Sequence, residues 1–281
     1  MIATPPLVLV FGANDPSGGA GLAADILTLA SLGCHPLPVV TALTVQDTTG
    51  VQEFQPVEPD WLQDQARYIL EDMQIDAIKV GMVGSIENLA VIAEIAADYP
   101  DIPLVFEPVL NSGHDEPSGE EMINAMRELL MPHTLIITPN SIEARRLASD
   151  DPDEQEELAL DAAASRLLDC GCEYVLITGT HENTPKVNNT LFSRAGRTRS
   201  DSWDRLPGSY HGAGCTLASA IAGALASGAE LPVAVRDAQE YTWQALSRAF
   251  RPGMGQFIPD RLFWARTGEE EEAAKPETPA A

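Results

Sequence analysis

Short apolar runs alternate along the chain with longer segments whose apolar residues recur at helical spacing. The strands expected from the short runs span residues 7–11, 38–42, 77–80, 104–106, 135–138 and 174–178. The expected helices span residues 19–32, 61–73, 86–99, 119–130, 140–148 and 154–169. Strands and helices that alternate in this way are typical of parallel strands joined by crossover helices. The pattern therefore predicts an α/β fold with a central, mostly parallel sheet.

The last third of the chain departs from this alternation. A polar strand pair is expected over 188–193 and 198–203, followed by two adjacent helices over 213–227 and 233–250. Ligands of open α/β sheets collect at the carboxyl ends of the strands, where the loop before residue 213 should lie. We expect one domain over residues 1–266 and an acidic, disordered tail over 267–281.

Composition narrows the function classes. The net charge of -25 disfavours a general nucleic-acid or anionic-membrane surface, which needs clustered Lys and Arg. The chain shows neither a signal-peptide pattern at its start nor an apolar run of ~20 residues, so we expect a cytoplasmic protein. The four cysteines are too few for a disulfide scaffold, and Cys170 and Cys172 lack a second pair at zinc spacing.

The segment His211-Gly-Ala-Gly-Cys-Thr216 leads directly into the helical pattern that follows it. Backbone N–H groups at such a turn converge, and the helix dipole adds positive potential there. The segment therefore predicts an anion hole, and a cysteine at that position is expected to have a lowered pKa. The alternative is a tight turn with Cys215 packed as a small apolar residue.

A second glycine-rich stretch, residues 12–21, joins the first strand to the first helix. It lets another molecule approach the backbone closely. Gly19, Gly21 and Ala24 satisfy a loose dinucleotide fingerprint, but seven positions separate Gly12 from Gly19, too many for the tight turn of that motif. The chain also lacks a Walker-type phosphate loop.

Several motifs in this order resemble the hydroxymethylpyrimidine/phosphomethylpyrimidine kinases of thiamine synthesis, a ribokinase-like family. The matching segments are Asp15-Pro-Ser-Gly-Gly-Ala-Gly21 with Asp25, Val40-Thr-Ala-Leu-Thr-Val-Gln46, Lys79-Val-Gly-Met82, Pro108-Val109, Thr138-Pro-Asn140-x-x-Glu143 and residues 211–216. The resemblance implies a three-layer αβα sandwich and a homodimer. It also implies ATP- and Mg²⁺-dependent phosphorylation of 4-amino-5-hydroxymethyl-2-methylpyrimidine and then of its monophosphate.

The resemblance also implies a substrate site. Its members would be Gln46, Ala20, Asp25, Thr44, Met82 and Val109. An amide at position 46 can donate to and accept from the pyrimidine edge at once. For Met82 and Val109, packing in the core is an equally good interpretation.

Transfer itself would take place at the anion hole. Gly212, Ala213 and Gly214 would hold the phosphoryl oxygens, and Cys215 would orient the hydroxymethyl group and take its proton late. Asn140, Glu143 and Glu107 are expected to place Mg²⁺, although Asn140 is equally a good helix N-cap. Thr178, Gly179 and His211 are assigned to the ATP site.

Three departures from the family pattern leave alternatives open. Thr178 stands where the family usually has a lysine that meets the ATP phosphates, and Lys186 is a candidate replacement. Glu107 replaces a common Asp, and Thr44 replaces an apolar residue. The alternatives are a pyridoxal or pyridoxine kinase and a catalytically weak pyrimidine-binding paralogue. A cysteine hydrolase that uses Cys215 and His211 is disfavoured, because no orienting partner is evident.

Overall fold

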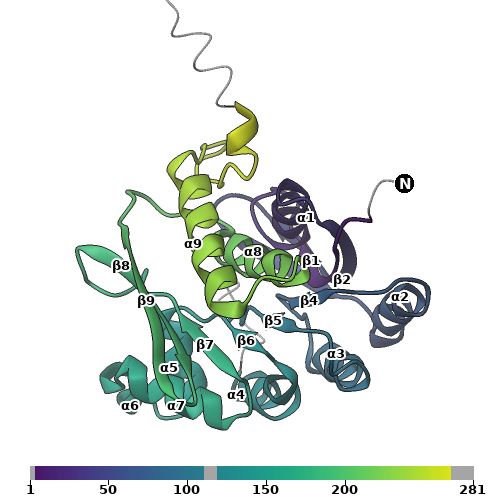
Figure 1. Cartoon of the computed structure of the whole chain (residues 1–281), viewed down its shortest axis with the longest axis horizontal. Coiled ribbons are helices and arrows are strands. Elements are labelled where there is room, and N and C mark those ends of the chain that lie inside the picture. Colours follow the sequence, from purple (N-terminus) through teal and green to yellow (C-terminus); the bar gives the residue numbers. More distant parts are fainter. Residues whose placement is uncertain (1–3, 111–118, 267–281) are drawn as a thin grey trace, which may run out of the picture.

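One mixed sheet organises the chain in the computed structural model, which describes residues 4–110 and 119–266 (Figure 1). Within these residues the strand order is β3-β2-β1-β4-β5-β6-β7-β8-β9. The strands are β1 Leu7–Asn14, β2 His35–Gln46, β3 Val51–Pro56, β4 Ala77–Val80, β5 Leu104–Phe106, β6 Ile136–Ile137, β7 Tyr174–Ile177, β8 Lys186–Ser193 and β9 Gly196–Asp204. Strands β2, β1, β4, β5, β6 and β7 are parallel, and β3, β8 and β9 pair antiparallel at the two edges.

Helices cover both faces of this sheet (Figure 1). They are α1 Gly21–Ser31, α2 Pro59–Asp72, α3 Ile86–Asp98, α4 Glu120–Ala125, α5 Ser141–Ala148, α6 Pro152–Glu157, α7 Leu160–Asp169, α8 Ala213–Ala226 and α9 Leu231–Ser247. Successive side chains of a strand point to opposite faces, so β1 contributes to two cores. Val8 and Val10 pack with α1, α8 and α9, whereas Leu9 and Phe11 pack with α2, α3 and α7. The expected three-layer αβα sandwich is confirmed.

Three elements differ from the sequence prediction. Strand β2 runs on to Gln46 and pairs with β3, an edge strand that was not expected because its exposed residues are polar. The helix expected over 154–169 is two helices, since the backbone at Leu158 and Ala159 is extended. The helix expected over 119–130 consists of the α-helix α4, Glu120–Ala125, followed directly by one π-helical turn, Met126–Leu130.

The first turn of α8 lies over the carboxyl ends of the central strands. Helix α8 packs against β1, β4 and β5. Glu107, the residue directly after β5, lies close to Gly214 in the first turn of α8. Among the described residues, no helix combines the length and apolar character that a membrane crossing requires. The tail expected over residues 267–281 lies outside the described residues.

Candidate active site

Gly212 starts the predicted anion hole in a conformation that favours glycine. Its φ is 81°, and an added Cβ would lie 1.9 Å from the Gly19 carbonyl oxygen. Helix α8 begins at the next residue, and Thr216 closes the first turn by donating its N–H to Gly212 at 3.0 Å. The first N–H groups of a helix have no partner within it. Gly212, Ala213 and Gly214 therefore present backbone donors at the positive end of α8, as expected.

Cys215 lies in this first turn but does not have the expected lowered pKa. Its side chain is buried, and burial raises its pKa well above the usual value, as does the nearby Glu107 carboxylate. The opposing effect of Lys79 is smaller. The expectation of a thiolate was wrong because it considered the helix dipole and left out burial and a neighbouring negative charge. Cys215 is a neutral thiol.

A buried charge cluster lies beneath the anion hole. The Lys79 ammonium of β4 is 2.9 Å from Asp25 Oδ1 of α1 and 2.9 Å from Glu107 Oε2, which follows β5. Ser219, one turn beyond Cys215 on α8, donates its hydroxyl to Asp25 Oδ1 at 2.6 Å. Burial alone would lower the pKa of Lys79, but the two carboxylates outweigh it and raise that pKa, so the lysine stays charged. Lys79 and Ser219 both contact Oδ1, and among the described residues the buried Asp25 Oδ2 has no hydrogen-bond partner.

Asp15 organises the glycine-rich loop after β1. Its carboxylate accepts from the Ala20 N–H at 2.7 Å, from the Ser17 N–H at 2.8 Å and from the Ser17 hydroxyl at 3.0 Å. His211 Nε2 lies 2.8 Å from Asp15 Oδ2. Burial would raise the pKa of Asp15, but these bonds and one from Gln46 hold it well below its usual range. The structure therefore brings Ala20, Gln46 and His211 together around one ionised carboxylate.

The Asp15–His211 pair bears on the hydrolase alternative. The sequence analysis found no orienting partner for His211, and the structure supplies one in Asp15. A cysteine nucleophile nevertheless needs a thiolate. Because Cys215 stays protonated, the pair does not make it one.

Arg261, which the sequence analysis missed, joins the two glycine loops. Its guanidinium donates to the carbonyls of Gly19 at 2.6 Å and Gly212 at 3.3 Å, and to the Thr216 hydroxyl at 3.0 Å. The residue is 2% exposed. Gly212 and Gly19 are 49 and 242 positions from Arg261. A single arginine so far from both segments gives no sign in the sequence that the fold brings them together.

The remaining predicted substrate residues are Thr44 of β2, Met82 after β4 and Val109 after β5. Thr44 donates its hydroxyl to the Asn14 carbonyl at 2.7 Å, so this polar side chain is satisfied at the end of β1. Met82 is half-buried, and its carbonyl accepts from Thr41 at 2.5 Å. Val109, two residues beyond Glu107, is also half-buried. Neither Met82 nor Val109 belongs to the fully packed core.

Of the three residues expected to place a metal, Asn140 and Glu143 form the N-terminal cap of α5, and Glu107 lies at the anion hole. Asn140 caps α5 by accepting from Ile142 N–H and Glu143 N–H, both at 3.0 Å, and Glu143 Oε2 accepts from Asn140 N–H at 2.9 Å. This capping box is the alternative interpretation of Asn140. Burial, with help from the Glu107 charge, raises the pKa of Glu143 to about 7. Glu107 lies directly under the anion hole, because a Cβ on Gly214 would be 2.6 Å from its Oε1.

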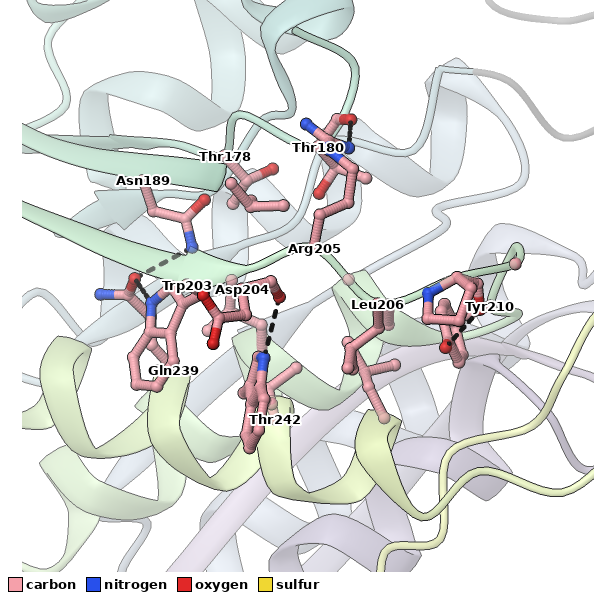
Figure 2. A pocket seen from close by; sticks show the side chains of 18 residues that line it. Thr178, Thr180, Asn189, Trp203, Asp204, Arg205, Leu206, Tyr210, Gln239 and Thr242 are labelled. Atoms are coloured by element: carbon pink, nitrogen blue, oxygen red, sulfur yellow. Dashed lines mark hydrogen bonds between the residues drawn. The ribbon is translucent and has the colours of Figure 1, made fainter. Parts of the chain in front are cut away.

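A cavity of 510 Å³ opens beside Ala213 and Gly214, a volume in the range of small-molecule sites. Its walls come from the loop after β7, from β8 and β9, from the loop after β9, and from α8 and α9. Figure 2 shows Thr178 and Thr180 on one side and Gln239 and Thr242 of α9 on the other. Of the predicted ATP residues, Thr178 lines this cavity, whereas Gly179 and His211 do not. Gly179 donates its N–H to Asn189, and His211 lies against Asp15.

The sheet covered on both faces and the glycine loop at the start of α8 occur here together with similarity in sequence and structure to known kinases, and the class is a ribokinase-like small-molecule kinase. The profile of the phosphomethylpyrimidine kinase family matches residues 15–260. This chain belongs to that family.

Relatives and solved structures agree. The hydroxymethylpyrimidine/phosphomethylpyrimidine kinase of Streptomyces coelicolor is 37% identical over 257 residues, covering 90% of this chain and 93% of that protein. The Escherichia coli protein of the same description is 32% identical, covering 86% and 91%. A pyridoxal kinase of Staphylococcus aureus in complex with AMP-PCP superposes with a TM-score of 0.82 at 25% identity, covering 94% and 96%. A phosphomethylpyrimidine kinase of Clostridium difficile superposes with a TM-score of 0.69 at 28% identity, and the match covers 86% of this chain and 100% of that one.

Proposed function

We propose that this protein transfers the γ-phosphoryl group of ATP to the hydroxyl of 4-amino-5-hydroxymethyl-2-methylpyrimidine, and then phosphorylates the monophosphate to the diphosphate. One observation carries the proposal. The loop after β1, which contains Ala20 and whose Asp15 bonds Gln46 at the end of β2, meets the anion hole directly, because Gly19 lies against Gly212 and His211. An acceptor bound at the first loop would therefore lie beside phosphate oxygens bound at the second. The family membership and the named activity of the relatives support the same reaction.

The chain's own residues would bind and position the reactants. Gln46 would hold the pyrimidine edge, and the N–H groups of Gly212, Ala213 and Gly214 would bind the transferring phosphoryl oxygens. The acceptor oxygen forms a bond to γ-phosphorus, and the bond from γ-phosphorus to ADP breaks. In a loose transition state the hydroxyl proton leaves late, so a neutral Cys215 can orient the hydroxyl; the proton would pass to an oxygen of the transferred phosphoryl group, because the protonated thiol cannot take it as expected.

Mg²⁺ fits the residues beneath the anion hole. Glu107 Oε2 is 2.9 Å from the Lys79 ammonium, whereas Oε1 lies toward Gly214 and would be the oxygen that binds a cation at the phosphates. Among the described residues, no group of three or more His, Cys, Asp or Glu side chains could hold a metal. Mg²⁺ is usually held by one or two carboxylates together with substrate phosphates and water. Glu107 and Glu143 would hold the ion, which would neutralise charge on the phosphates.

A homodimer is supported by exposed apolar side chains on β2 and α2. Leu43 and Val45 are 54% and 60% exposed, and Trp61 and Tyr68 are 71% and 75% exposed. Gln65, between the two aromatic residues, accepts from the β2 Val40 N–H at 3.4 Å and joins the two elements. Sedimentation of the wild type and of Trp61→Glu tests this interface, since the substitution should yield monomers.

Cytoplasmic location is the setting we infer for this enzyme. Its four cysteines are unpaired, which suits a reducing compartment. Fractionation of cells that produce the tagged protein tests the inference.

Pyridoxal phosphorylation is the second candidate, because the Staphylococcus aureus structures that superpose at 0.82 are named pyridoxal kinases. Purified protein with Mg·ATP is given the pyrimidine alcohol, its monophosphate or pyridoxal, and products are identified by mass. Mono- and diphosphorylated pyrimidine support the proposal, and product from pyridoxal alone overturns it. Ring binding without product would indicate the weak paralogue.

A further inference from the structure

Arg205 is the one basic side chain among the described residues that line the 510 Å³ cavity. It follows directly after β9, and its side chain reaches across the cavity mouth toward Thr180 (Figure 2). The threonines opposite it, Thr178 and Thr180, carry no charge. Ala213 and Gly214 of the anion hole line the same cavity, so Arg205 and the anion hole face one space.

Three carbonyl oxygens of the loop after β7 hold the guanidinium in place. Nη1 donates to Thr180 at 2.7 Å, Nη2 to Glu182 at 2.9 Å and Nε to Thr184 at 3.2 Å. A guanidinium has five N–H donors, so one hydrogen remains on each terminal nitrogen. Two free donors on an oriented planar group match the oxygens of a phosphate, and little side-chain entropy is lost on binding.

The charge of Arg205 is not neutralised by the described part of the protein. No carboxylate of these residues lies within 4 Å of it, although the chain carries a net charge of -25. The neighbouring Asp204 is 3.3 Å from Lys186 instead. Lys186, the candidate replacement for the family lysine, is therefore paired, and it is not among the residues that line the cavity.

We propose that Arg205 binds the polyphosphate of the donor nucleotide through its two remaining N–H groups and supplies the cationic charge that Thr178 lacks. This inference rests on the proposed function, in which ATP is the phosphoryl donor and its phosphates bind at the anion hole; it places the rest of the nucleotide in the adjoining cavity. The loop carbonyls aim the guanidinium, and the anion hole binds the far end of the same phosphate chain. Arg205 is thus a donor-binding residue, separate from the residues that hold the acceptor.

The test compares how binding depends on the number of phosphates. Adenosine, AMP, ADP and ATP are titrated calorimetrically, with constant Mg²⁺, into the wild type, Arg205→Gln and Arg205→Lys, with Lys186→Gln as the matched control. Arg205→Gln should leave adenosine affinity within ~2-fold and weaken ATP by at least ~10-fold, the effect of a lost charge-assisted pair. Arg205→Lys should be intermediate, and Lys186→Gln should match the wild type. In turnover, KM for ATP should rise while KM for the acceptor stays constant.

Two results would overturn the inference. If Arg205→Gln weakens adenosine and ATP equally, the residue only shapes the loop, and if it weakens neither, the cation lies elsewhere. If ATP affinity falls only in Lys186→Gln, Lys186 is the cation that binds the polyphosphate, and the inference is wrong. A wild type that binds no ATP would instead overturn the proposed function, and this inference with it.

Discussion

The Arg261 guanidinium donates to the Gly19 carbonyl at 2.6 Å and so fixes the loop after the first strand to the start of α8. Gly19 precedes Ala20 in the glycine-rich loop after β1, where we place the acceptor. Gly212, whose carbonyl also accepts from Arg261, begins the anion hole. One buried side chain thus sets the spacing between the two halves of the site. Spacing matters because positioning supplies much of the rate in phosphoryl transfer.

We expect Arg261→Ala to lower both stability and turnover. The buried carbonyls would lose their donor, which should cost on the order of 2 kcal/mol in the free energy of unfolding. Arg261→Lys keeps the charge but cannot reach three acceptors at once, so it should fold better than the Ala variant and still lose kcat. Urea unfolding and steady-state kinetics measure both effects. Arg194→Ala, at an exposed arginine of the β8–β9 turn, is the control; an equal loss there would refute the role.

Cys215→Ala should reduce transfer by at least ~10-fold while ring affinity is kept, because the thiol orients the hydroxyl without contributing most of the binding. Acceptor binding is measured by calorimetry and transfer by product mass. Cys34→Ala is the control, since Cys34 is also buried and lies beside Gly223, away from the anion hole. Unchanged turnover in Cys215→Ala would remove this residue from the chemistry.

Gln46→Ala should weaken acceptor binding and leave ATP binding unchanged. The amide is the side chain that matches the donor and acceptor groups of the pyrimidine, and its loss should cost about 1 kcal/mol, or roughly 5-fold in affinity. Gln52→Ala, an exposed amide on the neighbouring β3, controls for general effects on this edge of the sheet. Equal acceptor affinity in wild type and Gln46→Ala would place Gln46 outside the pocket.

Asp15→Asn should remove stability in a pH-dependent way. The pKa of Asp15 is lowered in the folded protein, so its stabilisation is fully present above the unfolded value of about 3.9 and is lost as the pH falls below it. The free energy of unfolding of the wild type should exceed that of the variant by about 2 kcal/mol at pH 7, and this difference should narrow below about pH 4. Urea unfolding across this range measures it, with exposed Asp64→Asn as the control. A gap that is constant with pH would mean that Asp15 is not held ionised.

The apolar periodicity was sufficient to predict the parallel strands and most helices. It missed β3 because an edge strand with exposed Gln52, Glu53 and Gln55 has no apolar face to reveal it. It also joined α6 to α7, because the break at Leu158 and Ala159 has no glycine or proline to mark it.

The site was predictable where local sequence determines local geometry. Glycines, a helix start and the Asn140–Glu143 cap are short-range features. Lys79, Arg261 and Arg205 act through partners distant in sequence, so their roles required the fold. The pKa of Cys215 was predicted in the wrong direction for the same reason, since burial and the charge of Glu107 come from tertiary structure.

The most direct test of the central claim is a competition in one reaction. Wild-type protein receives equal concentrations of the hydroxymethylpyrimidine and pyridoxal with limiting Mg·ATP, and both phosphorylated products are quantified by mass. The account predicts an excess of pyrimidine monophosphate, followed by its diphosphate when more ATP is added. Pyridoxal phosphate as the main product would contradict it.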